Sequence, residues 1–220
     1  MLYTAQRAIY HKKRFKKLAV ITLILFILFL VHPIFMYLGF FTLIFTLREY
    51  NRHITWKKGF EGEFRVIEEF NYPESVILSD IHLPNRRGNI DHVIVNSKGI
   101  FVLETKNYSG EYYVNGDVWT IGSSKKRKRR IRSPTIEAKR EASAISSLLK
   151  RVLKKEYYVQ PLIVLTGDAI IWEKTKSTVP IFELEKLDAY LNQFPNRLTK
   201  EEVLKIVSVL EKYAQHVKET

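Results

Sequence analysis

The feature that most constrains this chain is an apolar run near its N-terminus, in which no residue from Leu18 to Leu47 is charged at neutral pH. As one helix the run would extend about 45 Å, against a bilayer hydrocarbon core of about 30 Å. The pair His32-Pro33 divides the run, and proline interrupts the hydrogen-bond ladder of a helix. The sequence therefore predicts a transmembrane segment over residues 18–47. A tight hairpin that turns at His32-Pro33 is favoured, and a single kinked, tilted span is the alternative.

Lysine and arginine flank this run on both sides, and such flanks favour the cytoplasmic side of a membrane. The flanking cations are Arg7, Lys12, Lys13, Arg14, Lys16 and Lys17 before the run, and Arg48, Arg52, Lys57 and Lys58 after it. We therefore expect a basic cytoplasmic N-terminus over residues 1–17, a basic linker over 48–58, and a following domain that faces the cytoplasm from the cytoplasmic membrane. A cleaved signal peptide is disfavoured, because the apolar stretch is longer than a signal sequence requires.

The net charge of +13 is unevenly distributed along the 220 residues. Residues 1–58 contribute +9 and residues 59–220 contribute +4, of which the loop from Lys125 to Arg132 alone supplies seven cations. This distribution excludes a protein that coats nucleic acid with a uniformly basic surface. The chain has no cysteine, which excludes a disulfide framework and any thiolate metal site.

Hydrophobic periodicity and turn residues predict an α/β domain over residues 59–170, with a C-terminal strand and helices over residues 171–220 packing on it. Helices are expected at 56–71, 135–153 and 184–192, and Thr199 with Glu202 forms a capping box before a last helix. Strands are expected at 75–82, 90–95, 100–105, 157–165 and 180–184, and a further hairpin over 108–121 turns at Asn115-Gly116. This order favours a mixed β-sheet flanked by helices.

Charged side chains fall at the ends of two neighbouring strands of this domain. Asp91 begins one strand, and Glu104 and Lys106 end the next as Glu-Thr-Lys. The spacing of two puts Glu104 and Lys106 on one strand face, and a turn at residues 97–99 can bring Asp91 beside Glu104. Glu63 lies on the preceding helix.

This grouping suits the hydrolysis of a phosphodiester. Carboxylates bind Mg²⁺ or Mn²⁺, and the bound metal lowers the pKa of a water molecule. We expect Asp91, Glu104 and Glu63 to be metal ligands, and Lys106 to complete the catalytic set by orienting the water or stabilising the phosphate oxygens. An exposed ion pair is the alternative interpretation of Glu104 and Lys106.

Three further polar residues are assigned elsewhere. Asp80 and His82 precede a turn and are assigned to it rather than to the metal site. His92 alternates to the strand face opposite Asp91, so we expect a packed or hydrogen-bonded histidine rather than a base.

Four pieces of the sequence together resemble a known family. They are Gly59-Phe-Glu-Gly62-Glu63, Ile90-Asp91-His92-Val-Ile-Val, Gly99-Ile-Phe-Val-Leu-Glu104-Thr-Lys106-Asn107-Tyr-Ser-Gly110 and Trp119. The combination is similar to the nuclease-related domain (NERD) family of the PD-(D/E)xK endonuclease-like superfamily, over about residues 59–170. The resemblance implies a restriction-endonuclease-like fold and places Glu63, Asp91, Glu104 and Lys106 at the family's catalytic positions. Pro134 matches the start of the next family helix, where Glu137 replaces the usual glutamine.

The basic loop offers a candidate binding surface. Its cations are Lys125, Lys126, Arg127, Lys128, Arg129, Arg130 and Arg132. Such a cluster can bind a phosphate backbone without sequence specificity, or lie on anionic lipid. Its place directly after the hairpin of the acidic site favours nucleic acid.

The leading interpretation is a membrane-anchored, metal-dependent phosphodiesterase that acts on nucleic acid, with DNA favoured over RNA. The alternative is a non-catalytic membrane-anchored module that binds nucleic acid or anionic lipid through the basic loop. The clustered carboxylates favour the enzyme, because a pure binder gains nothing from placing acids beside phosphate. The sequence identifies no protein partner.

Overall fold

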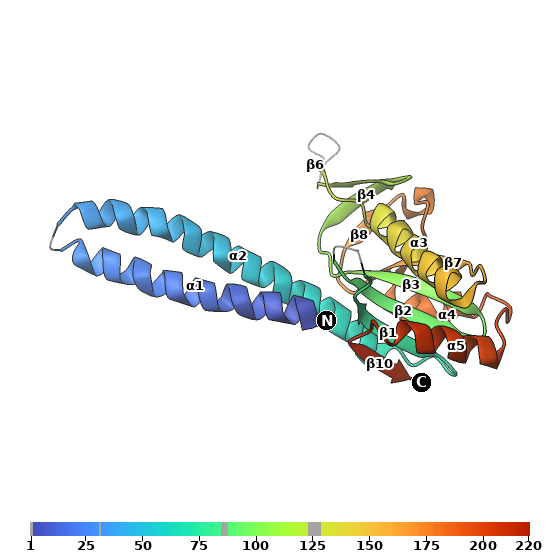
Figure 1. The fold of residues 1–220 in the computed structure, drawn as a ribbon. Coiled ribbons are helices and arrows are strands. Elements are labelled where there is room, and N and C mark those ends of the chain that lie inside the picture. The colour runs from blue at the N-terminus through green and yellow to red at the C-terminus, as the bar shows by residue number, and fades with distance from the viewer. Residues whose placement is uncertain (1, 31, 85–87, 123–128) are drawn as a thin grey trace. The chain divides into compact units, whose positions relative to one another are not determined.

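The computed structural model describes residues 2–30, 32–84, 88–122 and 129–220, and the chain divides into two compact units (Figure 1). Residues Leu2–Glu61 form a unit of two helices, and Gly62–Thr220 form an α/β unit. The second helix continues from the first unit into the other, because its range extends to Glu69.

The helical unit consists of α1 (Leu2–Leu28) and the first part of α2 (Ile34–Glu69), with the turn between them at His32-Pro33. The helices are antiparallel, since residues early in α1 contact residues late in this part of α2. The contacts that define this order are His11 with Glu49 at 2.6 Å, Thr22 with Thr42 at 3.0 Å, and the rings of Phe26 and Phe40 at 5.4 Å. A short-range turn therefore produces a helical hairpin held by both polar and aromatic contacts.

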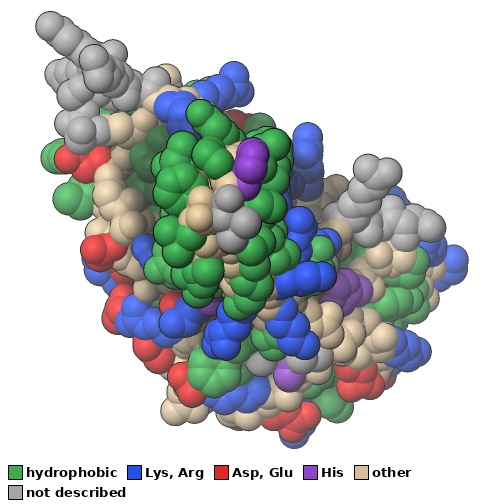
Figure 2. All heavy atoms as spheres, turned by 90° about the vertical axis from the view of Figure 1, so that its left-hand side faces the viewer, with side chains coloured by type: hydrophobic (Ala, Val, Ile, Leu, Met, Phe, Trp, Pro, Cys, Tyr) green, Lys and Arg blue, Asp and Glu red, His purple; other side chains and the backbone are tan. Residues whose placement is uncertain are grey.

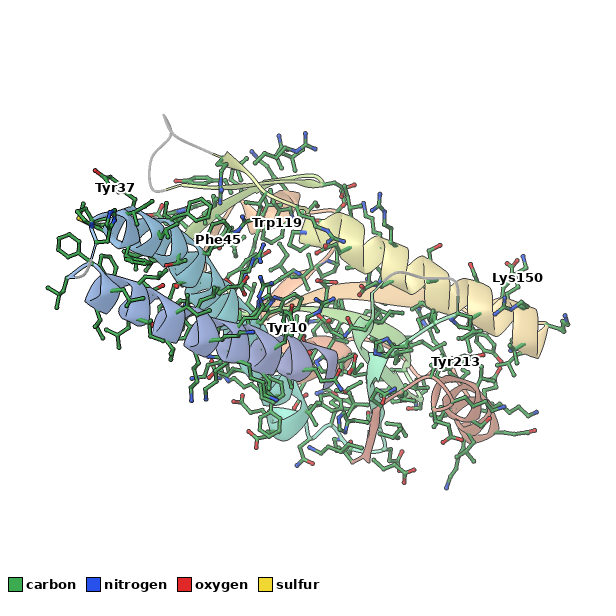
Figure 3. All side chains as sticks on the ribbon, turned by 60° about the vertical axis from the view of Figure 1, so that its left-hand side comes forward. Tyr10, Tyr37, Phe45, Trp119, Lys150 and Tyr213 are labelled. Atoms are coloured by element: carbon green, nitrogen blue, oxygen red, sulfur yellow. The ribbon has the colours of Figure 1, made fainter. Side chains whose placement is uncertain are left out.

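Large apolar side chains are exposed along this hairpin. They include Leu23, Ile27, Tyr37, Phe41 and Ile44. Figure 2 shows hydrophobic side chains gathered at the end of the hairpin that faces the viewer, and Figure 3 shows Tyr37 pointing away from α1.

The predicted transmembrane segment over residues 18–47 is wrong. Within the part of the chain that the structure describes, no helix has an apolar stretch long enough to cross a membrane. Basic residues occupy α1 as far as Lys17, the turn follows Leu28, and the apolar part of α2 ends at Arg48. Each helix therefore keeps only a short apolar piece, whereas a span needs about 20 such residues. The same finding contradicts the predicted membrane anchor and the predicted membrane location.

The α/β unit contains a six-stranded mixed sheet in the order β10-β1-β2-β3-β7-β9. Its strands are β1 (Val76–Ile81), β2 (Ile90–Asn96), β3 (Gly99–Lys106), β7 (Val159–Leu165), β9 (Ile181–Glu183) and β10 (His216–Glu219). Strands β10, β1, β2 and β3 pair antiparallel in turn, whereas β3, β7 and β9 pair in parallel. The mixed sheet that the sequence predicts is therefore present.

A second sheet of four strands has the order β6-β5-β4-β8. Its strands are β4 (Glu111–Asn115), β5 (Val118–Ile121), β6 (Arg129–Arg130) and β8 (Ile170–Trp172). The predicted turn lies between β4 and β5, where Gly116 adopts the left-handed φ of 60°. Trp119 is fully buried in this sheet and donates from Nε1 to Thr135 Oγ1 at 2.5 Å.

Helices cover both faces of the large sheet. They are α3 (Pro134–Leu153) and α5 (Lys200–Leu210) on one face, and the end of α2 with α4 (Leu187–Leu191) on the other, with short 3₁₀ helices at Lys174–Lys176 and Leu184–Lys186. Alternate residues of β3 supply the two cores: Ile100 and Val102 contact the first, and Phe101 and Leu103 the second. This arrangement explains why β3 is an unbroken apolar run rather than an alternating one.

The helix starts follow the local signals in the sequence. Ser133 caps α3 by accepting from the Ile136 N–H, and Pro134 occupies the first turn, where its missing N–H has no intrahelical partner. The predicted capping box of Thr199 and Glu202 is confirmed at the start of α5.

Three strands were not predicted: β6, β8 and β10. Each has four residues or fewer. Strands β8 and β10 pair with strands distant in sequence, and β6 lies at the edge of the smaller sheet. The His216–Glu219 segment alternates polar and apolar residues too briefly to indicate a strand, and it forms one because β1 offers a free edge.

Leu149→Ala is expected to lower the free energy of unfolding by about 2–5 kcal/mol, because Leu149 is 0% exposed in the core between α3 and the sheet. Urea denaturation followed by circular dichroism measures the change. Leu204→Ala is the matched control, since Leu204 on α5 is 61% exposed and its loss leaves no cavity. Equal losses in the two variants would contradict this assignment of the core.

Candidate functional site

The pairing of β2 with β3 brings Asp91 to the end of β3. His92 is opposite Leu103 in the antiparallel register, so Asp91 lies beside the last residues of β3. The backbone N–H of Thr105 donates to Asp91 Oδ2 at 2.9 Å. The predicted proximity of Asp91 and Glu104 follows from this register.

Lys106 lies between two carboxylates. Its Nζ forms an ion pair with Glu104 and is 3.1 Å from Glu137 Oε2. Glu104 and Lys106 share the β3 face of Ile100 and Val102, which is covered by α3, and Glu137 is in the first turn of that helix. Packing of apolar residues along β3 thus sets which helix supplies the third charged group.

Glu137 is the site residue whose role the sequence did not assign. Its Oε2 contacts Lys106, and its Oε1 pairs with Arg132, whose side chain is 82% exposed. The available signal was the acid at the position where the family that the sequence resembles usually carries glutamine. An acid there adds negative charge beside Glu104, and Lys106 compensates for it.

The two carboxylates on the neighbouring strands are hard to ionise. Burial raises the pKa of Asp91 to about 7, repulsion from Glu63 adds to the shift, and the Lys106 charge and the Thr105 N–H oppose it. Burial also raises the pKa of Glu104 to about 7, where attraction to Lys106 opposes the shift and repulsion from Asp91 and Glu137 supports it. The site therefore holds more negative charge than its surroundings stabilise.

Lys106 remains protonated. Burial disfavours its charge, but Glu104 and Glu137 outweigh that effect and raise the pKa of Lys106 well above its usual value. A lysine in this state is a hydrogen-bond donor and a positive charge, not a base.

Glu63 reaches the site because α2 approaches the end of β3 closely at Gly62. A Cβ on Gly62 would lie 2.7 Å from Thr166 Oγ1 and 2.9 Å from Asn107 Cβ, which is too close for any side chain. The glycine thus allows the helix to place Glu63, itself buried, where its charge acts on Asp91. The four predicted residues Glu63, Asp91, Glu104 and Lys106 are brought together in this region.

The oxygen-rich donor set fits a hard divalent cation, although no metal cage is preformed. Across residues 2–30, 32–84, 88–122 and 129–220, no three His, Asp or Glu side chains are arranged to hold a metal ion. Mg²⁺, however, commonly takes one or two carboxylates and keeps its other ligands as water. Asp91 and Glu104 supply two. Burial, together with repulsion from neighbouring carboxylates, raises the pKa of each, and a bound cation would favour their charged forms.

A second polar cluster lies on the paired strands β1 and β2. Asp80 is fully buried within β1, not in the turn as expected, and it adopts a left-handed φ of 55°. Its Oδ1 accepts from Asn89 Nδ2 at 2.9 Å and lies 3.0 Å from His82 Nε2. His92 contacts Ser79 Oγ through Nδ1 at 2.8 Å, and burial lowers the pKa of His92 to about 3, so it is a neutral, packed histidine as predicted.

The structure describes only part of the basic loop. Lys125, Lys126, Arg127 and Lys128 lie outside the described residues. Arg129 and Arg130 form β6 at the edge of the smaller sheet and are exposed. Arg132 is the one described loop cation that pairs with the acidic site, through Glu137.

The wild-type free energy of unfolding is expected to fall as pH rises from about 4 to about 7. A carboxyl group with a raised folded-state pKa keeps its proton in the folded state after the unfolded chain has lost it, so folding becomes less favourable across that window. Asp91→Asn retains an oxygen for the Thr105 N–H but cannot ionise. We expect it to exceed the wild type by about 1 kcal/mol or more at pH 8 and to match it near pH 4.

Urea titrations at the two pH values test this difference. Asp168→Asn, at an exposed position, is the control and should differ from the wild type equally at both pH values. An Asp91→Asn protein that is less stable than the wild type at pH 8 would refute the electrostatic account.

Comparison with known proteins gives one family. Residues 58–166 match the family described as "Nuclease-related domain". No curated protein and no solved structure matches the chain. The match spans α2 from Lys58 through β7, and so includes Glu63, Asp91, Glu104, Lys106 and Glu137. It is consistent with the PD-(D/E)xK-like nuclease superfamily and indicates a nuclease-related function with nucleic acid as partner. Residues 58–166, which include these five residues, thus match the nuclease-related domain (NERD) family.

Proposed function

We propose that this protein is a metal-dependent phosphodiesterase that cleaves nucleic acid, with DNA as the preferred substrate. The observation that carries the proposal is the pairing of two buried, hard-to-ionise carboxylates, Asp91 and Glu104, with a lysine that keeps its proton. A scaffold has no need to keep such charges together, since replacing them with apolar residues of similar size is often neutral or stabilising.

Asp91 and Glu104 would hold Mg²⁺ or Mn²⁺. When bound, the ion would lower the pKa of a coordinated water and offset charge on the phosphate. The Thr105 N–H fixes Asp91 through its Oδ2, which leaves Oδ1 as the oxygen available to a ligand. The strand pairing of β2 and β3 holds the two carboxylates on rigid elements.

Lys106 would stabilise the developing charge on the phosphate oxygens or orient the attacking water. Its contacts with Glu104 and Glu137 keep it charged and direct Nζ toward the carboxylates. Glu63 would assist as a third ligand or as the base that positions the water. Glu137 acts through Lys106 and is therefore a positioning residue.

The exposed arginines of β6 would contact the nucleic-acid backbone. Arg129 and Arg130 are exposed cations, and such contacts to the phosphate backbone would be independent of sequence and would weaken as salt rises. The smaller sheet joins them to the acidic site, because β5 leads through β6 into α3, where Glu137 begins the first turn.

The 220-residue chain is expected to cut labelled DNA, and RNA less well, in the presence of Mg²⁺ or Mn²⁺. Asp91→Asn and Glu104→Gln should each lower the cleavage rate by about a hundredfold or more, since each removes one ligand charge from the site. Gel analysis of single- and double-stranded DNA and RNA measures the rates.

Glu61→Gln is the matched control, because Glu61 lies on α2 near Glu63 but its side chain is about half exposed and pairs with Lys57. It should cut at the wild-type rate. A folded wild type that binds DNA and cuts none of the four substrates with either ion would instead support a non-catalytic nucleic-acid-binding module.

Divalent metal alone is expected to raise the melting temperature of the wild type. Saturation at about 100 times the dissociation constant corresponds to about 2.7 kcal/mol of added stability. Glu104→Gln should lose most of this increase, and Glu61→Gln should keep it. Differential scanning fluorimetry with and without Mg²⁺ or Mn²⁺ measures the shift, and equal shifts in both variants would place the metal elsewhere.

A further inference from the structure

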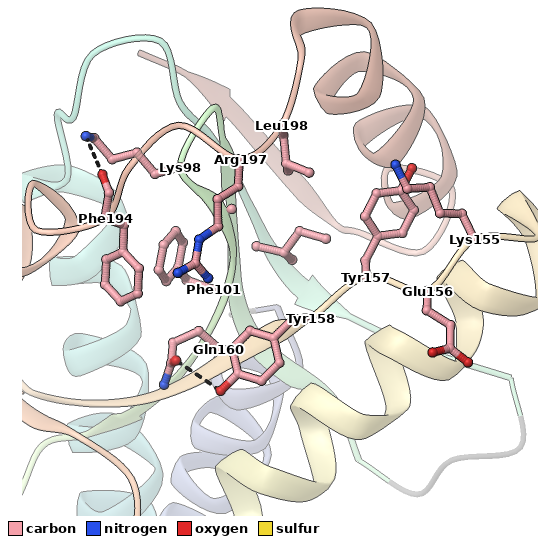
Figure 4. A pocket seen from close by; sticks show the side chains of 12 residues that line it. Lys98, Phe101, Lys155, Glu156, Tyr157, Tyr158, Gln160, Phe194, Arg197 and Leu198 are labelled. Carbon is pink, nitrogen blue, oxygen red and sulfur yellow. Dashed lines mark hydrogen bonds between the residues drawn. The ribbon is translucent and has the colours of Figure 1, made fainter.

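A cavity of about 210 Å³ lies at the end of β3 opposite the acidic site. It is bounded by the turn that begins β3, by the segment leading into β7, and by the loop between α4 and α5 (Figure 4). At about 3.3 Å per residue, Gly99 lies about 23 Å from Lys106 along the strand. No single nucleotide or metal ion can therefore occupy both places, and the cavity is a separate site.

The walls of this cavity are joined by direct hydrogen bonds. The Ser97 carbonyl accepts from the N–H groups of Arg197 and Leu198 at 2.7 and 2.9 Å, and Ser97 Oγ donates to Asn196 at 3.0 Å. Lys98 Nζ donates to the Phe194 carbonyl at 3.0 Å, which Figure 4 shows as a dashed line. The α4–α5 loop is thus fixed against the β2–β3 turn, and the cavity has a defined shape.

Aromatic rings supply most of the lining. Phe101 and Phe194 meet edge to face with centroids 5.2 Å apart, and both contribute to the cavity. Tyr157 is buried, whereas Tyr158 is 69% exposed and its hydroxyl donates to Gln160 Oε1 at 3.2 Å. A large ring that stays exposed at the mouth of a cavity is a surface on which a flat ligand can stack.

Three cations, Lys98, Lys155 and Arg197, line the cavity with these rings, but they differ in whether a carboxylate neutralises them. Lys155 pairs with Glu202, and the one acid of the lining, Glu156, pairs with Lys150. Arg197 has no ion pair with any acid that the structure describes, and its guanidinium lies 5.8 Å from the centre of the Phe194 ring. Figure 4 shows this guanidinium directed into the cavity. A cation held there without a carboxylate is a site for an anion.

We propose that this cavity binds a nucleotide, with the base on the Tyr158 ring and the phosphate on the Arg197 guanidinium. The planar guanidinium matches two phosphate oxygens at once, and an aromatic ring stacks on any base. Lys98, whose Nζ contacts the Phe194 carbonyl, adds a second positive charge to the lining. The volume lies below the range of ordinary small-molecule pockets, which favours one base rather than a large cofactor.

The nucleotide has two possible sources: a free mononucleotide, or one unit of a single strand whose remainder lies on the surface. Both present the same base and phosphate to Tyr158 and Arg197. The proposal does not depend on cleavage at the acidic site, since the contacts involved share no residue with it.

Calorimetric titration of the full chain in EDTA tests the proposal. The probes are dAMP, deoxyadenosine, inorganic phosphate and a short single-stranded oligodeoxynucleotide. We expect dAMP or the oligonucleotide to bind more tightly than deoxyadenosine or phosphate. Tight dAMP binding identifies the free nucleotide as the source, and tight binding of the oligonucleotide alone identifies the strand.

Arg197→Gln and Tyr158→Leu are each expected to weaken binding about tenfold or more, by loss of the phosphate contact and of the stacking surface. Tyr158→Phe keeps the ring and should bind as the wild type does, and Arg197→Lys should fall between. Lys212→Gln removes an exposed cation outside the lining and should have no effect.

Three outcomes would overturn the proposal. The first is that a folded wild type binds none of the probes. The second is that binding is unchanged in both Arg197→Gln and Tyr158→Leu. The third is that phosphate binds as tightly as dAMP without regard to Tyr158, which would make the cavity a simple anion site.

Discussion

The architecture of the α/β unit depends on β3 being buried on both faces. Its alternate side chains contact two separate cores, one under α3 and α5 and the other under α2 and α4. A shift of β3 by one residue would exchange these two sets of side chains and move Glu104 and Lys106 to the wrong face. The position of the charged residues is therefore fixed by the packing of the apolar residues that precede them.

The charge balance at the end of β3 follows from this placement. Lys106 interacts with Asp91, Glu104 and Glu137, and Glu63 acts on the ionisation of Asp91. Burying such charges costs stability unless each is compensated, and Lys106 compensates only in part, since Asp91 and Glu104 keep pKa values of about 7. The local structure thus retains a deficit of positive charge, a property common at sites that bind cations or perform acid–base chemistry.

The two ends of β3 differ in chemistry because different elements meet there. At one end, α2 approaches through Gly62 and α3 contributes Glu137, so carboxylates gather around a lysine. At the other end, the α4–α5 loop docks on the β2–β3 turn and contributes Arg197 and Phe194 beside exposed Tyr158. One strand therefore separates an acidic site from a basic, aromatic cavity.

Local patterns in the sequence were enough to predict much of this domain. The strands β1, β2, β3 and β7, the helix α3, the β4–β5 turn and the capping box of α5 all lie close to where periodicity and turn residues indicated. The proximity of Asp91 to Glu104 was also predictable, because a two-strand hairpin with a short turn has a register set by that turn. The prediction of a membrane span was wrong, because it relied on the apolar composition of residues 18–47 taken together, whereas the structure divides this run between two helices.

The sequence by itself determined the elements whose signals lie within a few residues: the apolar run of β3, the Glu-Thr-Lys at its end, and the caps of α3 and α5. Only the tertiary structure decided that Glu137 meets Lys106, that Asp80 is buried, that β10 pairs with β1, and that Arg197 faces Tyr158 across one cavity. The physical reason is the same in each case. A hydrogen bond or ring contact within one turn is encoded by neighbouring residues, whereas a contact between segments far apart in the chain depends on how all the intervening elements pack.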